Sequence, residues 1–356
     1  MAFERDALAG KLPVTLITGF LGSGKTTLIT RLLKHPEMNR VAVVINEIGE
    51  IGIDHDLVTM SSENVSLLAN GCLCCTVRTD LQETLRELFG QRRAGTMIDF
   101  DRVIVETTGL ADPAPVIQTL VSDTMLAAHY RLDGVVTLID AVNGAGSLAR
   151  QPEAQKQIAL ADRILITKSD LVDAAAIDAL KATIHATNQI ADIRVVLMGE
   201  IEPSELTNLG LASARGTAAT LQFLGTPLDA VAGAGEGYLG TRVGLAKGTL
   251  HDPSINTLSL RFDTPFTWEG FSAALELLTN LRGPDMLRIK GIVNVAGKPV
   301  VVQGVQHIFH PPVELDRWPS ADTGTRLVFI TRNMSAEVIR GLFAAVGAVA
   351  GLGTKN

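Results

Sequence analysis

Short apolar runs alternate with helix-type patterns through the first half of the chain. Six of these runs are continuous, which is typical of strands that are covered on both faces of a sheet. They span residues 14–20, 41–46, 102–107, 134–140, 163–168 and 193–198. Helical patterns span residues 24–35, 78–90, 113–122 and 173–186. This alternation predicts an α/β domain with a doubly wound, mostly parallel sheet over residues 1–200.

The second half of the chain has a different order of elements. Residues 201–252 are rich in Gly, Ala and Thr and have poor periodicity, so we interpret them as a linker. The alternative is a loosely packed part of the first domain. A smaller α+β domain is predicted over residues 253–356. Its expected elements are a strand at 255–263, a helix at 267–281, strands near 286–295, 299–305 and 325–331, and a helix at 335–346.

Composition narrows the class of protein. The length of 356 residues exceeds that of a usual single domain, and 46% hydrophobic with 19% charged residues suits a large core. The net charge of −7 gives no basic surface for nucleic acid or an anionic membrane. The N-terminus lacks the apolar core of a secretory signal, and no run reaches the ~18 apolar residues of a membrane span. We therefore expect a cytoplasmic protein without nucleic-acid or membrane partners.

A phosphate-binding motif follows the first predicted strand. The segment GFLGSGKTT, residues 19–27, fits the P-loop pattern G-x-x-x-x-G-K-[ST] and opens the first predicted helix. Its glycines let backbone N–H groups surround phosphate oxygens at the helix N-terminus. Lys25 would reach the β- and γ-phosphates, and the Thr26 hydroxyl would hold Mg²⁺. The residues of this segment expected to bind nucleotide are Gly19, Gly22, Ser23, Gly24, Lys25, Thr26 and Thr27.

The segment VIVETTGLADP supplies a second phosphate element. Glu106 ends an apolar strand, where most P-loop GTPases carry Asp, and it can hold the Mg²⁺ shell through water. Gly109 is placed for its backbone N–H to sense a γ-phosphate. Lys25, Thr26 and Glu106 are the expected catalytic residues. Turnover should be slow, because we assign no arginine or glutamine to the attacking water.

The base should be selected by ITKSDL, residues 166–171, which ends a later predicted strand. A carboxylate at Asp170 can accept two N–H bonds from the edge of guanine, which adenine cannot offer. The stem of Lys168 would pack over the base plane. The usual GTPase pattern is N-K-x-D, and this chain has Thr167 in the place of Asn. Threonine can keep one hydrogen bond, so we expect GTP specificity with weaker affinity.

All three cysteines of the chain lie within GCLCCTVR, residues 71–78. In a reducing compartment, such a cluster indicates a metal-binding or reactive site more than disulfides. Three thiolates on one short turn, from Cys72, Cys74 and Cys75, suit Zn²⁺, Co²⁺ or Cu⁺. They leave a tetrahedral ion with one open position, which water, a carboxylate or a client protein would fill.

The acidic segment NEIGEIGID, residues 46–54, lies where a GTPase has its switch I. Glu47, Glu50 and Asp54 are carboxylates that can move with the γ-phosphate and complete the metal site, and Glu47 is the predicted ligand. The alternative for each is a solvated acidic loop. The order of segments suggests that the nucleotide state alters the geometry or exposure of the adjacent thiolates.

Along the chain, the P-loop is followed by NEIGEIGID, GCLCCTVR, ETTGLADP and TKSD, and this order and spacing resemble those of the CobW-type GTPases. This metallochaperone family of the P-loop GTPase class has cobalamin-synthesis, nitrile-hydratase-activator and zinc-transferase members. Residues 287–312 also resemble the C-terminal domain of that family. The resemblance implies hydrolysis of GTP with Mg²⁺, coupled to the binding and delivery of a transition metal, Zn²⁺ or Co²⁺, with the C-x-C-C cysteines as ligands.

Three functions remain open at this point. The first is a GTPase metallochaperone that loads a client metalloprotein or a cofactor-synthesis enzyme. The second is a nucleotide-gated interaction module whose metal is structural, and the third is an accessory enzyme of cobalamin synthesis. An open three-thiolate site favours the first over the second, and the third lacks any further catalytic constellation of side chains. The motifs leave the metal, the client and the oligomeric state undetermined.

Overall fold

The computed structural model describes residues 10–46, 58–60, 65–68, 73–76, 81–207, 209–210 and 255–352. Cys72, Glu47, Glu50 and Asp54 lie outside the described residues, as does the predicted linker from residue 211 to its end. The contacts divide the chain into two compact units. The described strands form two sheets, one in each unit.

The first unit is built on a sheet with the strand order β3-β4-β5-β2-β6-β1-β7-β8-β9. All pairings from β5 to β9 are parallel, whereas β3 and β4 are antiparallel to their neighbours. The predicted doubly wound, mostly parallel sheet is therefore confirmed. Its strands are β1 Leu12–Gly19, β2 Val41–Asn46, β3 Val58–Met60, β4 Val65–Leu68, β5 Leu73–Thr76, β6 Arg102–Thr107, β7 Tyr130–Asp140, β8 Arg163–Thr167 and β9 Asp192–Val195.

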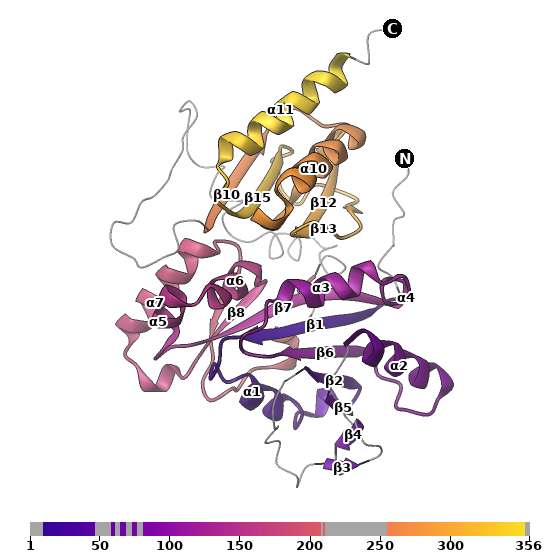
Figure 1. Ribbon diagram of the computed structural model, residues 1–356, viewed down its shortest axis with the longest axis vertical. Helices are drawn as coiled ribbons and strands as arrows, with labels where there is room; N and C mark the ends of the chain where they lie inside the picture. Colours follow the sequence, from indigo (N-terminus) through magenta and orange to yellow (C-terminus); the bar gives the residue numbers. More distant parts are fainter. Residues whose placement is uncertain are drawn as a thin grey trace. The chain divides into compact units, whose positions relative to one another are not determined.

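Helices cover both faces of this sheet (Figure 1). On one face, Leu28, Ile29 and Leu32 of α1 pack into a core cluster with side chains of the central strands. On the other face, α3 and α6 contact each other and β7. This double coverage explains why the strands are apolar without alternation. The helices are α1 Lys25–Leu32, α2 Leu81–Ala94, α3 Pro113–Ser122, α4 Thr124–His129, α5 Gly144–Arg150, α6 Pro152–Leu160 and α7 Ala174–Thr187, with short 3₁₀ turns η1 Pro36–Met38, η3 Ser169–Leu171 and η4 Pro203–Leu206.

The cysteine motif is not the turn that we expected. Cys74 and Cys75 lie in β5, where Cys74 is in register with Val43 of β2 and with Ser66 of β4. The prediction of a turn is therefore wrong for these two residues. A strand of four residues is too short to show a period, and it exists because β2 and β4 pair with it on both sides.

Part of the segment that we interpreted as a linker packs with the first unit. Leu206 is 1% exposed and belongs to the same core cluster as Leu28. The carbonyl oxygen of Leu206 accepts a hydrogen bond of 3.4 Å from Thr15 Oγ1. Ile201 and Leu209 of the same segment also pack against this cluster, but three apolar residues with irregular spacing give no periodic signal in the sequence.

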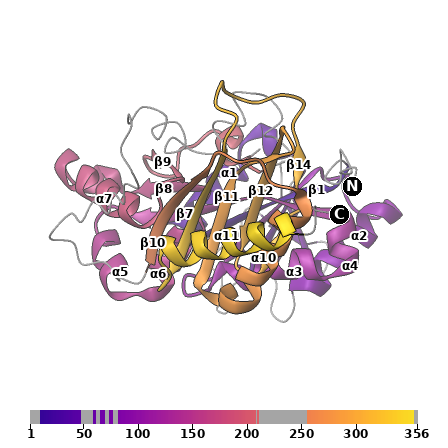
Figure 2. The same cartoon turned by 90° about the horizontal axis from the view of Figure 1, so that it is seen from above.

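The second unit is an antiparallel sheet with two helices on one face (Figure 2). Its strand order is β10-β15-β11-β12-β13, and β14 also pairs with β12. Phe271 of α10 and Phe343 of α11 pack against Phe329 of the sheet. The predicted α+β domain is confirmed, with β10 Ile255–Phe262, α10 Trp268–Arg282, η7 Gly283–Asp285, β11 Met286–Val295, β12 Lys298–Val305, β13 Ile308–Phe309, β14 Val313–Glu314, β15 Thr325–Arg332 and α11 Ala336–Leu352. Among the described residues, no helix has the length and apolar character needed to cross a membrane.

Candidate nucleotide-binding site

The tight turn between β1 and α1 depends on glycine. Gly19 and Gly24 have φ values of 144° and 93°, which L side chains rarely adopt. A Cβ on Gly19 would lie 2.4 Å from the carbonyl oxygen of Leu138 in β7. The backbone therefore approaches β7 more closely than any side chain permits. This turn lies at the edge where the carboxyl ends of β6, β1 and β7 meet, which is where parallel sheets bind ligands.

Lys25 folds back over this turn. Its Nζ atom donates hydrogen bonds to the carbonyl oxygens of Gly19, at 2.8 Å, and Phe20, at 3.4 Å. The residue is 6% exposed, so the ammonium group is held at the loop instead of in solvent. A phosphate bound at the N-terminus of α1 would meet this fixed positive charge as well as the helix dipole.

Two predicted Mg²⁺ residues from different motifs come together. Thr26 Oγ1 in the first turn of α1 lies 3.4 Å from Glu106 Oε1 near the end of β6. Glu106 is 1% exposed, whereas Thr26 is exposed at the surface of the loop. A hydroxyl and a carboxylate are hard oxygen donors of the kind that Mg²⁺ prefers, so this pair fits the ion.

The loop after β6 lies directly against the P-loop. A Cβ on Gly109 would lie 2.6 Å from Leu21 Cδ2 and 2.8 Å from the backbone nitrogen of Leu21. Gly109 is therefore a glycine for steric reasons. On its other side, Gln157 of α6 donates hydrogen bonds to the carbonyl oxygens of Gly109 and Ala111. Sequence reasoning missed Gln157, because nothing in a short helical segment marks which residue reaches another loop.

Thr167 links the predicted base segment to the P-loop. Its hydroxyl lies 2.7 Å from the carbonyl oxygen of Ser23 and 3.3 Å from that of Ile139. The residue is 5% exposed. The one hydrogen bond that this hydroxyl can donate thus goes to the backbone of the protein. Asp170, in contrast, is exposed in η3 at the end of β8.

Asp140 at the end of β7 is a second residue that sequence reasoning missed. Its Oδ2 atom accepts hydrogen bonds from Lys168 Nζ, at 2.7 Å, and Asn143 Nδ2, at 3.0 Å. Its Oδ1 atom accepts from the backbone N–H of Val142, at 2.7 Å, and of Asn143. Burial disfavours ionisation of the carboxyl, but these donors outweigh it and hold the pKa of Asp140 below its ordinary value. The sequence does contain a signal for this residue, because Asp140 is an aspartate at the end of an apolar strand.

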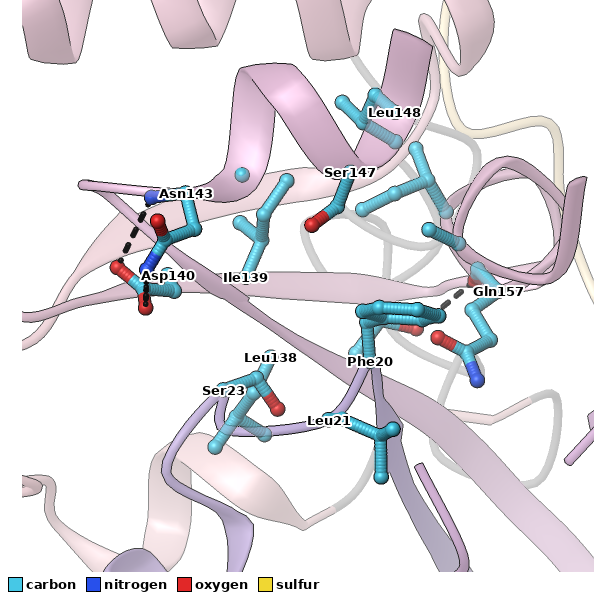
Figure 3. Close-up of a pocket in the computed structure, with 14 residues that line it drawn as sticks. Phe20, Leu21, Ser23, Leu138, Ile139, Asp140, Asn143, Ser147, Leu148 and Gln157 are labelled. Carbon is cyan, nitrogen blue, oxygen red and sulfur yellow. Dashed lines mark hydrogen bonds between the residues drawn. The ribbon is translucent and has the colours of Figure 1, made fainter. Parts of the chain in front are cut away.

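A small hollow lies behind the P-loop (Figure 3). It contains about 330 Å³ of space, part of it open to solvent, between Phe20, the end of β7, and the helices α5 and α6. Apolar side chains such as Ile139, Leu148 and Ile158 form most of its wall. Gln157 projects from α6 toward Phe20 in this region. The hollow therefore lies between the P-loop and α5. Gln157 lines it and also donates hydrogen bonds to the loop after β6.

Two family models match the chain in succession. Residues 13–194 fit the CobW/HypB/UreG nucleotide-binding domain. Residues 255–346 fit the cobalamin synthesis protein cobW C-terminal domain. The chain belongs to the CobW family.

Individual relatives agree with this assignment. The zinc chaperone YjiA of Escherichia coli K12 is 32% identical over 94% of this chain and 98% of its own length. The zinc chaperone CobW of Pseudomonas aeruginosa PAO1 is 32% identical over 92% of this chain and 90% of its own. A crystal structure of Zn(II)-bound YjiA GTPase from E. coli has a TM-score of 0.74 at 29% identity, and covers 94% of this chain and 99% of that chain. The CobW-family fold therefore extends over both units.

We predict that Thr167→Val weakens nucleotide binding by this CobW-family protein. The change keeps the side-chain volume but removes the hydrogen bond to Ser23, so GDP affinity should fall about tenfold, equivalent to ~1.4 kcal/mol. Thr167→Ser keeps the hydroxyl and is the matched control. Isothermal titration calorimetry with GDP measures both variants. An affinity of Thr167→Val equal to that of the wild type would contradict the prediction.

We also predict a pH-dependent loss of stability for Asp140→Asn. Because the pKa of Asp140 is lowered in the folded state, its carboxylate stabilises the fold at pH values above its unfolded pKa of about 3.9. This contribution is lost as the pH falls through the folded pKa. The substitution should lower the free energy of unfolding by about 1–3 kcal/mol between pH 5 and 8, and by progressively less below pH 4. Urea unfolding followed by circular dichroism tests this, and a difference that persists undiminished at pH 3 would refute it.

Proposed function

We propose that this CobW-family protein is a GTPase metallochaperone. It hydrolyses GTP slowly with Mg²⁺, binds Zn²⁺ or Co²⁺ at its C-x-C-C motif, and delivers the metal to a client metalloprotein or a cofactor-synthesis enzyme. The names of its relatives, zinc chaperone and Zn(II)-bound GTPase, support this function. The single observation that carries it is the position of the cysteine strand beside the phosphate edge of the sheet.

The register of the strands sets this position. Thr76 at the end of β5 is in register with Ile45 of β2, and Ile45 is in register with Glu106 of β6. Neighbouring strands lie about 4.8 Å apart, so the backbones at Thr76 and Glu106 are about 10 Å apart. The three strands are parallel, so the C-x-C-C motif runs toward the same edge as Thr26 and Glu106. A change at the γ-phosphate can reach the metal ligands over this short distance.

The groups around the phosphate edge favour binding and orientation of GTP. Lys25 supplies a fixed positive charge, and Thr26 with Glu106 would hold Mg²⁺, which neutralises charge on the phosphates when bound. Exposed Asp170 would accept two N–H groups of guanine, and Lys168 is held beside it by Asp140. The predicted ligand Glu47 directly follows Asn46, the last residue of β2. Its segment would therefore connect the nucleotide to the metal.

The first prediction from this function concerns the nucleotide. GTP should compete for the site at least tenfold better than ATP, because only guanine offers two N–H groups to Asp170. Asp170→Asn should lose most of this preference, and Lys25→Ala should abolish productive binding of either nucleotide. Competition titration against labelled GTP measures all three proteins. Equal displacement by ATP and GTP from the wild type would rule out guanine specificity.

The second prediction concerns the coupling of metal and nucleotide. Metal affinity should be about 5–150-fold higher with a non-hydrolysable GTP analogue than with GDP, and linkage requires the metal to strengthen analogue binding by the same factor. Co²⁺ is a suitable probe, since thiolate ligands give it a charge-transfer absorption band. Glu47→Gln should reduce the ratio if this carboxylate completes the site. Because thiolates must lose protons to bind, metal affinity should rise with pH.

The matched control replaces Cys72, Cys74 and Cys75 together by serine. This variant should keep basal GTP binding, since no cysteine belongs to the phosphate or base motifs, but it should lose the enhancement by metal. Identical metal affinities with GDP and with the analogue in the wild type would indicate two independent sites. That result would favour an interaction module with a structural metal over a chaperone.

A further inference from the structure

The loop after β6 is held from α6 by two consecutive side chains. Gln157 Nε2 donates hydrogen bonds to the carbonyl oxygens of Gly109, at 3.2 Å, and Ala111, at 3.0 Å. Lys156 forms an ion pair with Asp112, which also caps the N-terminus of α3. Gln157 is 1% exposed, so its amide group is shielded from bulk solvent. The two hydrogen bonds of Gln157 hold the loop by its backbone, whereas the ion pair of Lys156 holds it through the Asp112 side chain.

The direction of these bonds determines where the N–H groups of the loop point. In a trans peptide unit, the C=O and the N–H point in opposite directions. The carbonyl of Gly109 points at Gln157, so the N–H of Leu110 points away from α6. The carbonyl of Thr108 accepts from the N–H of Ala111, at 3.1 Å, so the N–H of Gly109 points out of this turn. Gln157 thus holds the peptide units that follow Gly109 and Ala111, and the N–H of Ala111 in turn holds the unit that precedes Gly109.

The P-loop limits the movement of Gly109 on its other side. Even a Cβ would meet the backbone of Leu21 at 2.8 Å, so Gly109 already touches the P-loop. The loop therefore contacts Leu21 and is bonded to Gln157, so a movement of Gly109 away from α6 requires breaking the two hydrogen bonds of Gln157. Exchanging the positions of Oε1 and Nε2 of Gln157 would place an acceptor against the carbonyl oxygens of Gly109 and Ala111, which are themselves acceptors.

We propose that Gln157 is a positioning residue for GTP hydrolysis, which holds Gly109 where its N–H contacts the γ-phosphate. This inference rests on the proposed GTPase function and extends it to a residue outside the five motifs. GDP lacks the γ-phosphate, so Gln157 should discriminate between the two nucleotide states without contacting either. The effect requires no direct contact with substrate, and Gln157 is therefore not a catalytic residue.

The test compares two glutamines on the same helix. Gln157→Glu keeps the volume but places a carboxylate against two carbonyl oxygens, which repels the loop. Gln155 is the matched control: it is 7% exposed, and its Nε2 donates to the carbonyl oxygen of Leu148, at 2.7 Å, away from the loop. Gln155→Glu therefore introduces the same charge and a comparable structural cost. Gln157→Leu removes the donors without adding charge and serves if Gln157→Glu does not fold.

Three quantities are measured for each full-length protein: kcat and KM for GTP, the dissociation constants of GDP and of a non-hydrolysable GTP analogue, and the melting temperature. For Gln157→Glu and Gln157→Leu, kcat and the affinity for the analogue should fall about 5–50-fold, the value of two neutral hydrogen bonds. Affinity for GDP should stay within about twofold of the wild type. Gln155→Glu should lower the melting temperature but leave kcat and the ratio of the two affinities unchanged.

The remaining outcomes contradict either the positioning role of Gln157 or the proposed GTPase function. If the wild type hydrolyses GTP and the Gln157 variants keep its kcat and affinity ratio, the positioning role is wrong and the proposed function stands. If Gln155→Glu loses as much kcat as Gln157→Glu, the effect is general to α6 and the positioning role is again wrong. If the wild type does not hydrolyse GTP at all, the proposed function fails and the positioning role fails with it.

Discussion

The close approach of the β1–α1 turn to its neighbours is the constraint on which the site depends. Gly19 lies against the backbone of β7, and Gly109 lies against the backbone of Leu21. Both contacts are shorter than any Cβ permits, so the turn is packed from two sides by main chain. A loop packed in this way holds its N–H groups in place before a ligand arrives. Such preorganisation is what electrostatic stabilisation of phosphate requires.

Buried polar groups around the turn are held by hydrogen bonds, both from neighbouring residues and from distant parts of the chain. Thr167 bonds the carbonyl of Ser23, and Asp140 collects four donors, among them Lys168. A buried carboxylate is costly unless its oxygens are satisfied, and here the donors keep it ionised. The result is a rigid link from the P-loop to the end of β8. The segment expected to read the base is thereby attached to the segment expected to hold the phosphates.

The parallel sheet brings these segments together because all of its parallel strands end at one edge. β6 carries Glu106 there, β1 leads to Lys25 and Thr26, and β8 leads to Asp170. The same geometry directs β5, with Cys74 and Cys75, toward that edge two strands from Glu106. Through this register, the backbones at Thr76 and Glu106 lie about 10 Å apart.

Several strands and helices were predictable from the sequence. β2, β6 and α3 begin and end at the predicted residues, because long apolar runs and a helix that begins with proline give strong local signals. The short strands β3 to β5 and the helices α4 to α6 were not predicted, since segments of this length give little periodic signal and depend on tertiary contacts to form. The roles of Cys72 and Glu47 remain predictions from the motifs.

Tertiary structure alone decided which side chain holds which loop. Gln157 lies 48 positions from Gly109, and Thr167 lies 144 positions from Ser23. Leu206 enters a core formed by residues more than a hundred positions earlier as well as nearby ones. The sequence by itself determined the longer strands, the glycines and the chemical groups of the phosphate motifs, because these depend on local composition and spacing. Packing determined their supports, because a hydrogen bond between distant residues leaves no trace in the local pattern.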